Sequence, residues 1–200
     1  MYFIGIAGGS GSGKTTFSKK ILAHLASDQV INLHQDSYYL PAQPKDNFLM
    51  GKPNFDHPSA FDWPLLKEQI HTLSQGGAVD CPVYDFTTST RKSETVRIGP
   101  AKVIIFDGIY TLWDQEIRNH LDLKVFLHVD ADIRFIRRLH RDVRERGRSL
   151  DSIIKQYYDT VRPMHRQFLE ATQQFADITV GEETDIAADV IASKIKAVLA

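Results

Sequence analysis

The amino-acid sequence predicts an α/β protein in which a parallel sheet of about five strands carries helices on both faces. Two observations lead to this prediction. Short runs of apolar residues, each long enough for a buried strand, alternate along the chain with segments whose apolar residues recur at helical spacing. A glycine-rich segment, "GGSGSGKTTF" at residues 8–17, lies directly between the first such strand and the first such helix.

The expected elements follow from local patterns taken in order. Apolar runs predict strands at residues 2–7, 30–33, 103–106, 124–129 and 177–180. Asp62 is placed to cap a helix with Pro64 in its first turn, and Gly76 and Gly77 would stop it. The patterns at residues 79–86 and 94–98 predict an inserted β-hairpin. The other helices are expected at residues 14–26, at about 131–146, in a longer stretch interrupted by Pro163, and in an amphipathic tail with Ile186, Val190, Ile195 and Val198 on one side.

Composition excludes several classes of protein. A hydrophobic content of 42%, a charged content of 24% and a net charge of -1 fit an ordinary soluble globular protein without a global excess of positive charge for nucleic acid. The single cysteine, Cys81, excludes a disulfide framework or a cysteine-based zinc site within one chain. Apolar runs are far shorter than the roughly 18 residues of a membrane span. Since the first strand begins at residue 2, we expect no targeting peptide and a cytoplasmic protein of one domain, residues 1–200.

Residues 8–15 match the pattern GxxxxGK[ST] in the strand-to-helix context that this motif requires. Glycines let successive backbone N–H groups point at phosphate oxygens, and the following helix adds the positive end of its dipole. Lys14 is expected to contact the β and γ phosphates, and the Thr15 hydroxyl to bind Mg²⁺. The motif indicates a P-loop NTPase-type fold that binds ATP or GTP. The expected nucleotide-binding residues are Gly8, Gly9, Ser10, Gly11, Ser12, Gly13, Lys14, Thr15 and Thr16.

An acidic residue at the end of a neighbouring apolar strand should complete the metal site. Asp107 directly follows four apolar residues, 103–106, and is expected to hold the Mg²⁺ shell directly or through water. A strand-end aspartate can also be a simple turn residue, but the phosphate motif in the same chain favours the metal role. With Thr15 and Asp36, Asp107 forms the expected metal-binding set.

Asp36, at the end of the second strand in "HQDSYY", favours a small-molecule kinase. A GTP switch protein would need the guanine-reading motif NKxD, which does not occur, and a mechanical ATPase is usually longer. Because the carboxyl ends of adjacent parallel strands lie beside the phosphate-binding loop, Asp36 can take the proton of an acceptor hydroxyl. Such base catalysis contributes about 10²–10⁴ in rate. The alternative is an Asx turn that caps the next segment.

Arginines recur along the basic helix and just beyond it. Arg134, Arg138 and Arg141 fall on one helical stripe, and further arginines continue to residue 148. Arginines that close over a nucleotide can supply about 10³–10⁵ in rate, so we interpret about residues 138–150 as a lid with Arg141 and Arg146 in catalytic roles. A nucleic-acid-binding patch is the alternative. Acidic residues interrupt such a track, namely Asp130, Asp132, Asp142 and Glu145.

Taken together, these segments resemble the uridine kinase (uridine–cytidine kinase) family of P-loop nucleoside kinases over nearly the whole chain. The resemblance rests on "QDSYY", "NFDHPSAFDW", "PVYDF", "RRLHRDVRERGRSL", "IIKQYY" and "GEETDI". It implies the base role for Asp36, ribose binding by Asp56, and a base pocket walled by Tyr84 and Phe86. It further implies roles for six residues: Arg138 and Arg148 at the substrate, Arg141 and Arg146 near the phosphates, Gln156 at the pyrimidine edge, and Asp185 near the ATP base.

The resemblance implies transfer of the γ-phosphoryl group of ATP or GTP, with Mg²⁺, to the 5′-hydroxyl of uridine or cytidine. It also implies a homo-oligomer, a tetramer in many family members. Two positions depart from the family. Ser89 stands where a histidine usually reads the base, and Asp107 replaces a glutamate, which favours metal contact through water. A nicotinamide riboside kinase and a non-catalytic, RNA-binding nucleotide regulator remain as alternatives; the NFDHP-like stretch and the long lid argue against the first.

Overall fold

The computed structural model describes residues 1–25, 29–44, 47–49 and 51–200, and it is built on a parallel sheet. Five strands pair in the order β2-β7-β1-β8-β9, each parallel to its neighbours. Their bounds are Tyr2–Gly8 for β1, Val30–His34 for β2, Val103–Gly108 for β7, Leu123–Leu127 for β8 and Ile178–Val180 for β9. The predicted α/β sheet is confirmed, with strand ends displaced by only one or two residues.

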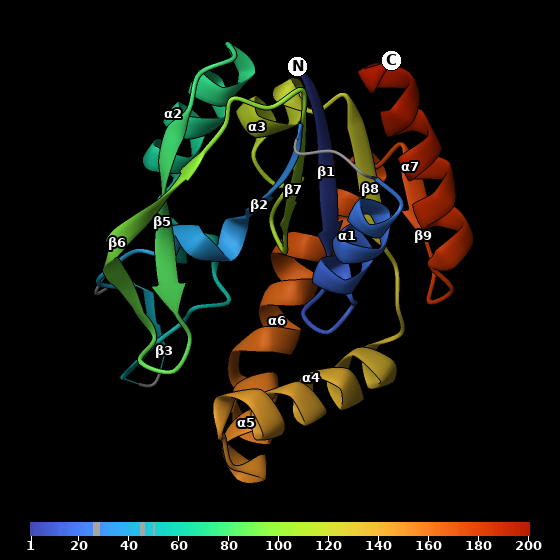
Figure 1. Ribbon diagram of the computed structural model, residues 1–200. Coiled ribbons are helices and arrows are strands. Elements are labelled where there is room, and N and C mark those ends of the chain that lie inside the picture. The colour runs from blue at the N-terminus through green and yellow to red at the C-terminus, as the bar shows by residue number, and fades with distance from the viewer. Residues whose placement is uncertain (26–28, 45–46, 50) are drawn as a thin grey trace.

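Helices cover both faces of the sheet (Figure 1). Alternate side chains of a strand point to opposite faces, so Ile4 and Ile6 join one apolar core while Phe3 and Ala7 join the other. The first core is closed by α1 (Lys14–Ala23) and α7 (Asp185–Leu199), and the second by α2 (Trp63–Ser74) and α3 (Gln115–His120). Burial on both faces explains why the central strand β7 begins with four consecutive apolar residues, 103–106.

The hairpin forms a separate two-stranded antiparallel sheet, β5 (Val79–Asp85) and β6 (Thr90–Ile98). The second strand therefore starts four residues before its predicted position. The Asp62 side chain accepts a hydrogen bond from the Leu65 amide at 3.2 Å, which confirms the predicted cap of α2. Between β2 and α2, strand β3 (Phe48–Leu49) pairs with β4 (Lys52–Pro53). The same segment contains two short 3₁₀ turns, η1 (Gln35–Tyr38) and η3 (Pro58–Ala60).

After β8, helix α4 (Ala131–Arg146) crosses the carboxyl ends of the strands (Figure 1). Short helical segments follow it: α5 (Leu150–Gln156), η4 (Tyr157–Val161), α6 (Arg162–Met164), η5 (His165–Leu169) and η6 (Glu170–Phe175). Two of them, η4 and η5, are wide π-helical turns on either side of Pro163. A proline nitrogen cannot donate a hydrogen bond, so the predicted interruption takes the form of these wide turns.

The apolar face predicted for the last helix is wrong in part. Ile186 and Val190 are 81% and 58% exposed, whereas the buried stripe of α7 consists of Ala188, Ile191, Ala192 and Ile195. The small alanines allow the helix to pack closely on α1 and the sheet, and this turns the larger Ile186 and Val190 outward. The first helix ends at Ala23, before its predicted end at residue 26, which itself lies outside the described residues. In the described part of the chain, no helix has the length and apolarity to cross a membrane.

Candidate active site

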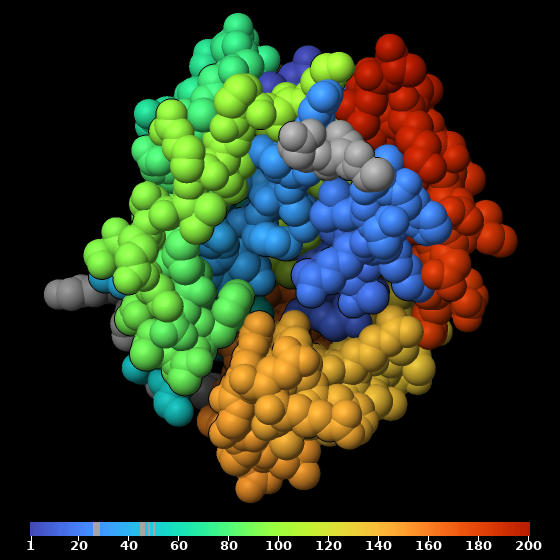
Figure 2. All heavy atoms as spheres, in the orientation of Figure 1, coloured from blue at the N-terminus to red at the C-terminus, as the bar shows by residue number. Residues whose placement is uncertain are grey.

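A cavity of about 810 Å³ lies at the carboxyl ends of the strands, where α1, the hairpin and α4 meet. Figure 2 shows the molecular surface hollowed between these elements. Most of the predicted site residues line it: Ser10, Gly11, Gly13, Lys14, Thr15, Thr16, Asp36, Asp56, Tyr84, Phe86, Ser89, Asp107, Arg138, Arg141, Arg146, Arg148 and Gln156. The other four, Gly8, Gly9, Ser12 and Asp185, lie outside this lining in the part of the chain that the structure describes.

Residues 8–15, the phosphate loop, make a tight turn that leads into α1. Gly11 and Gly13 have φ angles of 81° and 92°, in the left-handed region that favours glycine. The Lys14 ammonium donates hydrogen bonds to the carbonyls of Gly8 and Gly9 at 2.9 and 3.1 Å. Burial lowers the pKa of Lys14 to about 8, although Asp36 and Asp107 oppose the shift. Lys14 is therefore mostly protonated at neutral pH and held at the loop.

The phosphate loop lies directly against the first turn of α4. A Cβ atom at Gly9 would meet the Arg134 guanidinium, and one at Gly11 would collide with the Arg134 backbone carbonyl. Arg134 is itself fixed, because its Nε donates to the Val129 carbonyl at 2.9 Å and its Nη2 donates to His165 Nε2 at 3.3 Å. The buried side of α4 is thus polar, and it packs against the phosphate loop.

We expect Gly11→Ala to weaken nucleotide binding by about tenfold or more. An alanine in the left-handed region costs about 1–2 kcal/mol, and the contact with the Arg134 backbone adds strain that a side-chain movement cannot relieve. Calorimetric titration with Mg²⁺–ADP measures the effect. Gly76→Ala is the matched control: Gly76 has a φ of 82°, but a Cβ there meets open space. The control should lose stability alone, and equal nucleotide affinities in the two variants would contradict the packing argument.

Asp36 lies in η1, just after β2, and faces the same cavity as Lys14. Burial raises the pKa of Asp36, Lys14 is the strongest influence that lowers it, and Asp107 raises it again. The carboxylate and the ammonium are therefore close enough to act on each other's charge. This arrangement is the one that a base next to a phosphate-binding lysine requires.

Asp107 is the next-to-last residue of β7 and is only 4% exposed. Its Oδ2 accepts hydrogen bonds from Ser18 Oγ and Asn32 Nδ2, both at 3.2 Å, and its Oδ1 lies 3.1 Å from His34 Nδ1. Asp107, Asp36 and Thr15 all line the cavity, and they offer the hard oxygen ligands that Mg²⁺ prefers. Burial is the main cause of the raised pKa of Asp36, and the charge of Asp107 adds to it; a divalent cation would offset that repulsion. These residues fit a magnesium site.

Asp56 also lines the cavity and is 9% exposed. Its Oδ2 accepts hydrogen bonds from Thr160 Oγ1 at 2.7 Å and from Gln156 Nε2 at 3.2 Å. Thr160, in the wide turn η4, was not anticipated from sequence, because nothing local links it to a residue 104 positions away. The carboxylate is held firmly and keeps acceptor capacity for a ligand with two hydroxyls.

Aromatic side chains from the hairpin form one wall of the cavity. The rings of Tyr84 and Phe86 meet edge to face, with centroids 5.2 Å apart, and Tyr39 lies 5.0 Å from Tyr84. Burial raises the pKa of Tyr84 to about 12, so its hydroxyl stays protonated. The Arg146 guanidinium lies 4.2 Å above the Phe86 ring, which places the lid in contact with the hairpin. Ser89, at the tip, adopts a φ of 55°.

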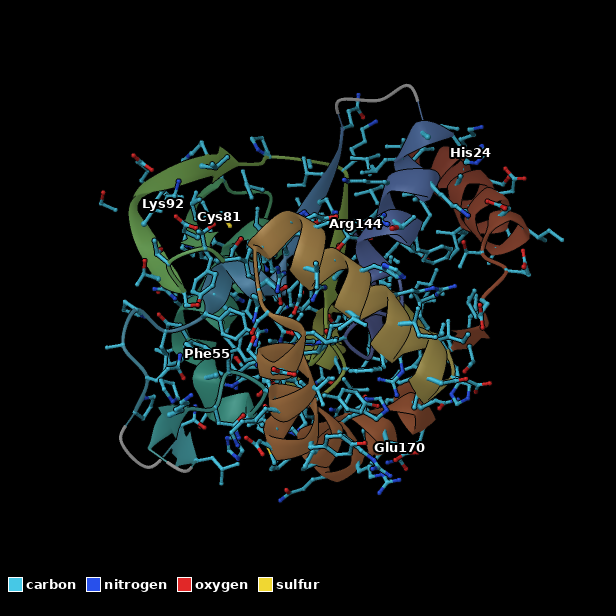
Figure 3. The ribbon with its side chains drawn as sticks, turned by 90° about the horizontal axis from the view of Figure 1, so that it is seen from below. His24, Phe55, Cys81, Lys92, Arg144 and Glu170 are labelled. Atoms are coloured by element: carbon cyan, nitrogen blue, oxygen red, sulfur yellow. The ribbon has the colours of Figure 1, made fainter. Side chains whose placement is uncertain are left out.

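Hydrogen bonds connect the phosphate loop with Asp56 through Arg138. One guanidinium nitrogen of Arg138 donates to Ser10 Oγ at 2.7 Å and the other to Gln156 Oε1 at 2.9 Å. Arg148 also donates to Gln156 Oε1, at 2.6 Å. Since the Gln156 amide donates to Asp56, the two halves of the cavity share one network. Seen from below, α4 runs across the strand ends, and Phe55 lies on the hairpin side (Figure 3).

Two further acidic residues are Asp185, a predicted site residue, and Asp142, which was not predicted to belong to the site. Asp185 begins α7 and pairs with Lys20 at 2.6 Å, so its contact with a nucleotide base remains a prediction. Asp142, which interrupts the basic track in the sequence, is completely buried and pairs with four arginines. The available signal was its spacing, because Arg138 and Arg146 stand four residues before and after it.

Comparisons with known proteins show which family the chain is similar to. Residues 3–187 match the sequence model of the Phosphoribulokinase / Uridine kinase family. The chain is 49% identical over 199 residues to a uridine kinase of Lactobacillus helveticus and 50% identical over 202 residues to one of Lactobacillus johnsonii; each match covers 98% of this chain and 94% of the relative. The structure of phosphoribulokinase from Rhodobacter spheroides superposes with a TM-score of 0.68 at 13% identity, over 90% of this chain and 69% of the other. This last likeness concerns the fold alone.

Proposed function

The chain belongs to the Phosphoribulokinase / Uridine kinase family, and from this premise we propose that it is a uridine kinase. The reaction is transfer of the γ-phosphoryl group of ATP to the 5′-hydroxyl of uridine or cytidine, which gives UMP or CMP and ADP. We further propose that residues 1–200 act as one kinase domain, with the hairpin at about 79–98 and the lid at about 138–150.

One observation carries the proposal: a single cavity joins the phosphate loop to Asp56 and the aromatic wall, and Asp36 lines it as well. A polyphosphate fits beside Lys14 and the N-terminus of α1. A ribose offers two neighbouring hydroxyls to the Asp56 carboxylate, and a flat base fits against Tyr84 and Phe86. The volume of about 810 Å³ lies within the range of small-molecule sites.

In the proposed mechanism, Asp36 accepts the proton of the 5′-hydroxyl as its oxygen bonds to the γ-phosphorus. The bond from that phosphorus to the β–γ bridging oxygen breaks, and ADP leaves with the electron pair. Lys14 and the lid arginines Arg141 and Arg146 stabilise the charge on the transferring group. When bound by Thr15, Asp36 and Asp107, Mg²⁺ would neutralise phosphate charge and help to align the donor.

A substrate panel tests the proposal directly. With ATP and Mg²⁺, we expect uridine and cytidine to be phosphorylated, and purine nucleosides and nicotinamide riboside to be poor acceptors. Mass spectrometry of the products identifies the monophosphates. Because a serine, Ser89, stands at the hairpin tip, the ratio of uridine to cytidine turnover measures what base selection remains without a histidine there. Phosphorylation of nicotinamide riboside alone would replace the proposed substrate, and no nucleoside phosphorylation at all would refute the kinase.

The phosphoryl donor and the oligomeric state are further proposals, and each can be measured directly. GTP as an alternative donor is read from the same assay, and the homo-oligomer, a tetramer by resemblance, from sedimentation. The RNA-binding alternative loses support because Arg134 and Arg138 are only 7% and 6% exposed and point to the phosphate loop rather than outward. Salt-dependent RNA binding without nucleoside phosphorylation would revive it.

A further inference from the structure

One fully buried carboxylate, that of Asp142, holds the arginines of the lid together. Its Oδ1 accepts hydrogen bonds from Arg141 Nε and Nη2 at 2.9 and 2.7 Å, and lies 3.5 Å from Arg146 Nη1. Its Oδ2 accepts from Arg148 Nη1 at 3.2 Å and lies 3.6 Å from Arg138 Nε. The Arg148 amide also donates to the Asp142 carbonyl at 3.1 Å, which ties the turn after α4 back to the helix.

The cluster of Asp142 and its four arginines contains more positive than negative charge. Burial alone would raise the pKa of Asp142, but the arginines outweigh burial and lower it, so the residue stays ionised. Four cations and one anion leave an excess of positive charge beside the cavity. Without the carboxylate, guanidinium groups only a few ångströms apart would repel one another, since they would share no counter-charge. All four arginines line the cavity, whereas Asp142 does not line it in the part of the chain that the structure describes.

We propose that Asp142 is a positioning residue that sets Arg138, Arg141, Arg146 and Arg148 in their working arrangement, without touching either substrate. The inference rests on the proposed function, in which these arginines surround the transferring phosphoryl group and the nucleoside. The proposal predicts that loss of the Asp142 charge affects nucleotide binding and the rate of transfer in different ways. Removing the negative charge makes the cavity more positive, which favours binding of a polyphosphate, but releases the arginines from the geometry that speeds transfer.

The test is Asp142→Asn, which keeps the shape of the side chain and removes its charge. We expect kcat to fall about 10- to 100-fold, because a misplacement of about 1 Å can cost that much. The dissociation constant of Mg²⁺–ADP, measured by calorimetry, should stay equal or decrease, and its salt dependence should become steeper. A merely structural role would weaken turnover and nucleotide binding together.

Asp132→Asn is the matched control. It makes the same charge change on the same helix, at an exposed position in the first turn, and should leave kcat and nucleotide affinity at the wild-type values. A double variant with Arg141→Lys adds a second readout: if Asp142 acts through Arg141, the double variant loses less than the product of the two single losses. Independent, multiplying losses would contradict the proposal.

If Asp142→Asn does not fold, Asp142→Glu retains the charge and displaces it by one methylene. We then expect lowered kcat with near-normal affinity for ADP. A kcat within about threefold of wild type in the Asn variant, or loss of folding in both variants, would overturn the proposal. The proposed function fails separately, because it requires the wild-type protein to phosphorylate a nucleoside, whereas ADP binding to the variants needs no acceptor.

Discussion

Asp36→Asn should lower kcat by about 10²- to 10⁴-fold, because the amide cannot take the proton of the attacking hydroxyl. The side chain keeps its size, and Lys14 and the phosphate loop keep their geometry, so the dissociation constant of ADP without metal should change little. Rapid-quench measurement of the first turnover separates this chemical step from product release.

Asp80→Asn provides the control for this substitution. Asp80 lies on the hairpin in an exposed ion pair with Arg97, so its change should leave turnover intact, since exposed pairs contribute only about 0–1 kcal/mol to stability. Near-normal turnover by Asp36→Asn would remove Asp36 from the base role. Equal losses in both variants would point to general destabilisation instead.

Arg141→Ala should lower the rate of phosphoryl transfer by about 10³- to 10⁵-fold, the largest effect that we expect. The Arg141 side chain is 31% exposed and lines the cavity, and its guanidinium is oriented by two hydrogen bonds to Asp142. A charge placed in this way stabilises the transition state more than the bound nucleotide, so kcat should fall much further than the affinity for ATP.

Arg144→Ala is the matched control for the lid. Arg144 is an exposed residue near the end of the same helix (Figure 3) and does not line the cavity among the described residues. We expect near wild-type single-turnover rates for it. A similar loss in both variants would show that overall positive charge matters and that the position of Arg141 does not.

The phosphate loop and the strand ends could be predicted because their signals are local. Glycine spacing identifies the loop, and apolar runs mark strands whose carboxyl ends must share one edge of a parallel sheet. Asp36, Lys14 and Asp107 could thus be assigned to one site from the sequence, and all three line the cavity. The hairpin and the cap of α2 followed from equally short-range patterns.

Helix faces were less predictable, since a face is defined by what packs on it. The last helix offers two apolar stripes, and the one with small alanines is buried because it allows close approach to α1. In α4 the usual rule is reversed: Arg134 and Arg138 are buried, while Ile136 and Val143 are 48% and 45% exposed. No period in the sequence distinguishes this arrangement from a solvated basic helix.

The sequence by itself determined which chemical groups are present and which edge of the sheet gathers them, because strand direction and loop geometry are set by neighbouring residues. Tertiary structure alone decided that α4 lies across that edge, close enough to the glycines of the phosphate loop to bury its arginines. Asp142 is buried in the same arrangement and pairs with four arginines, because a carboxylate removed from water must be paired with positive charge.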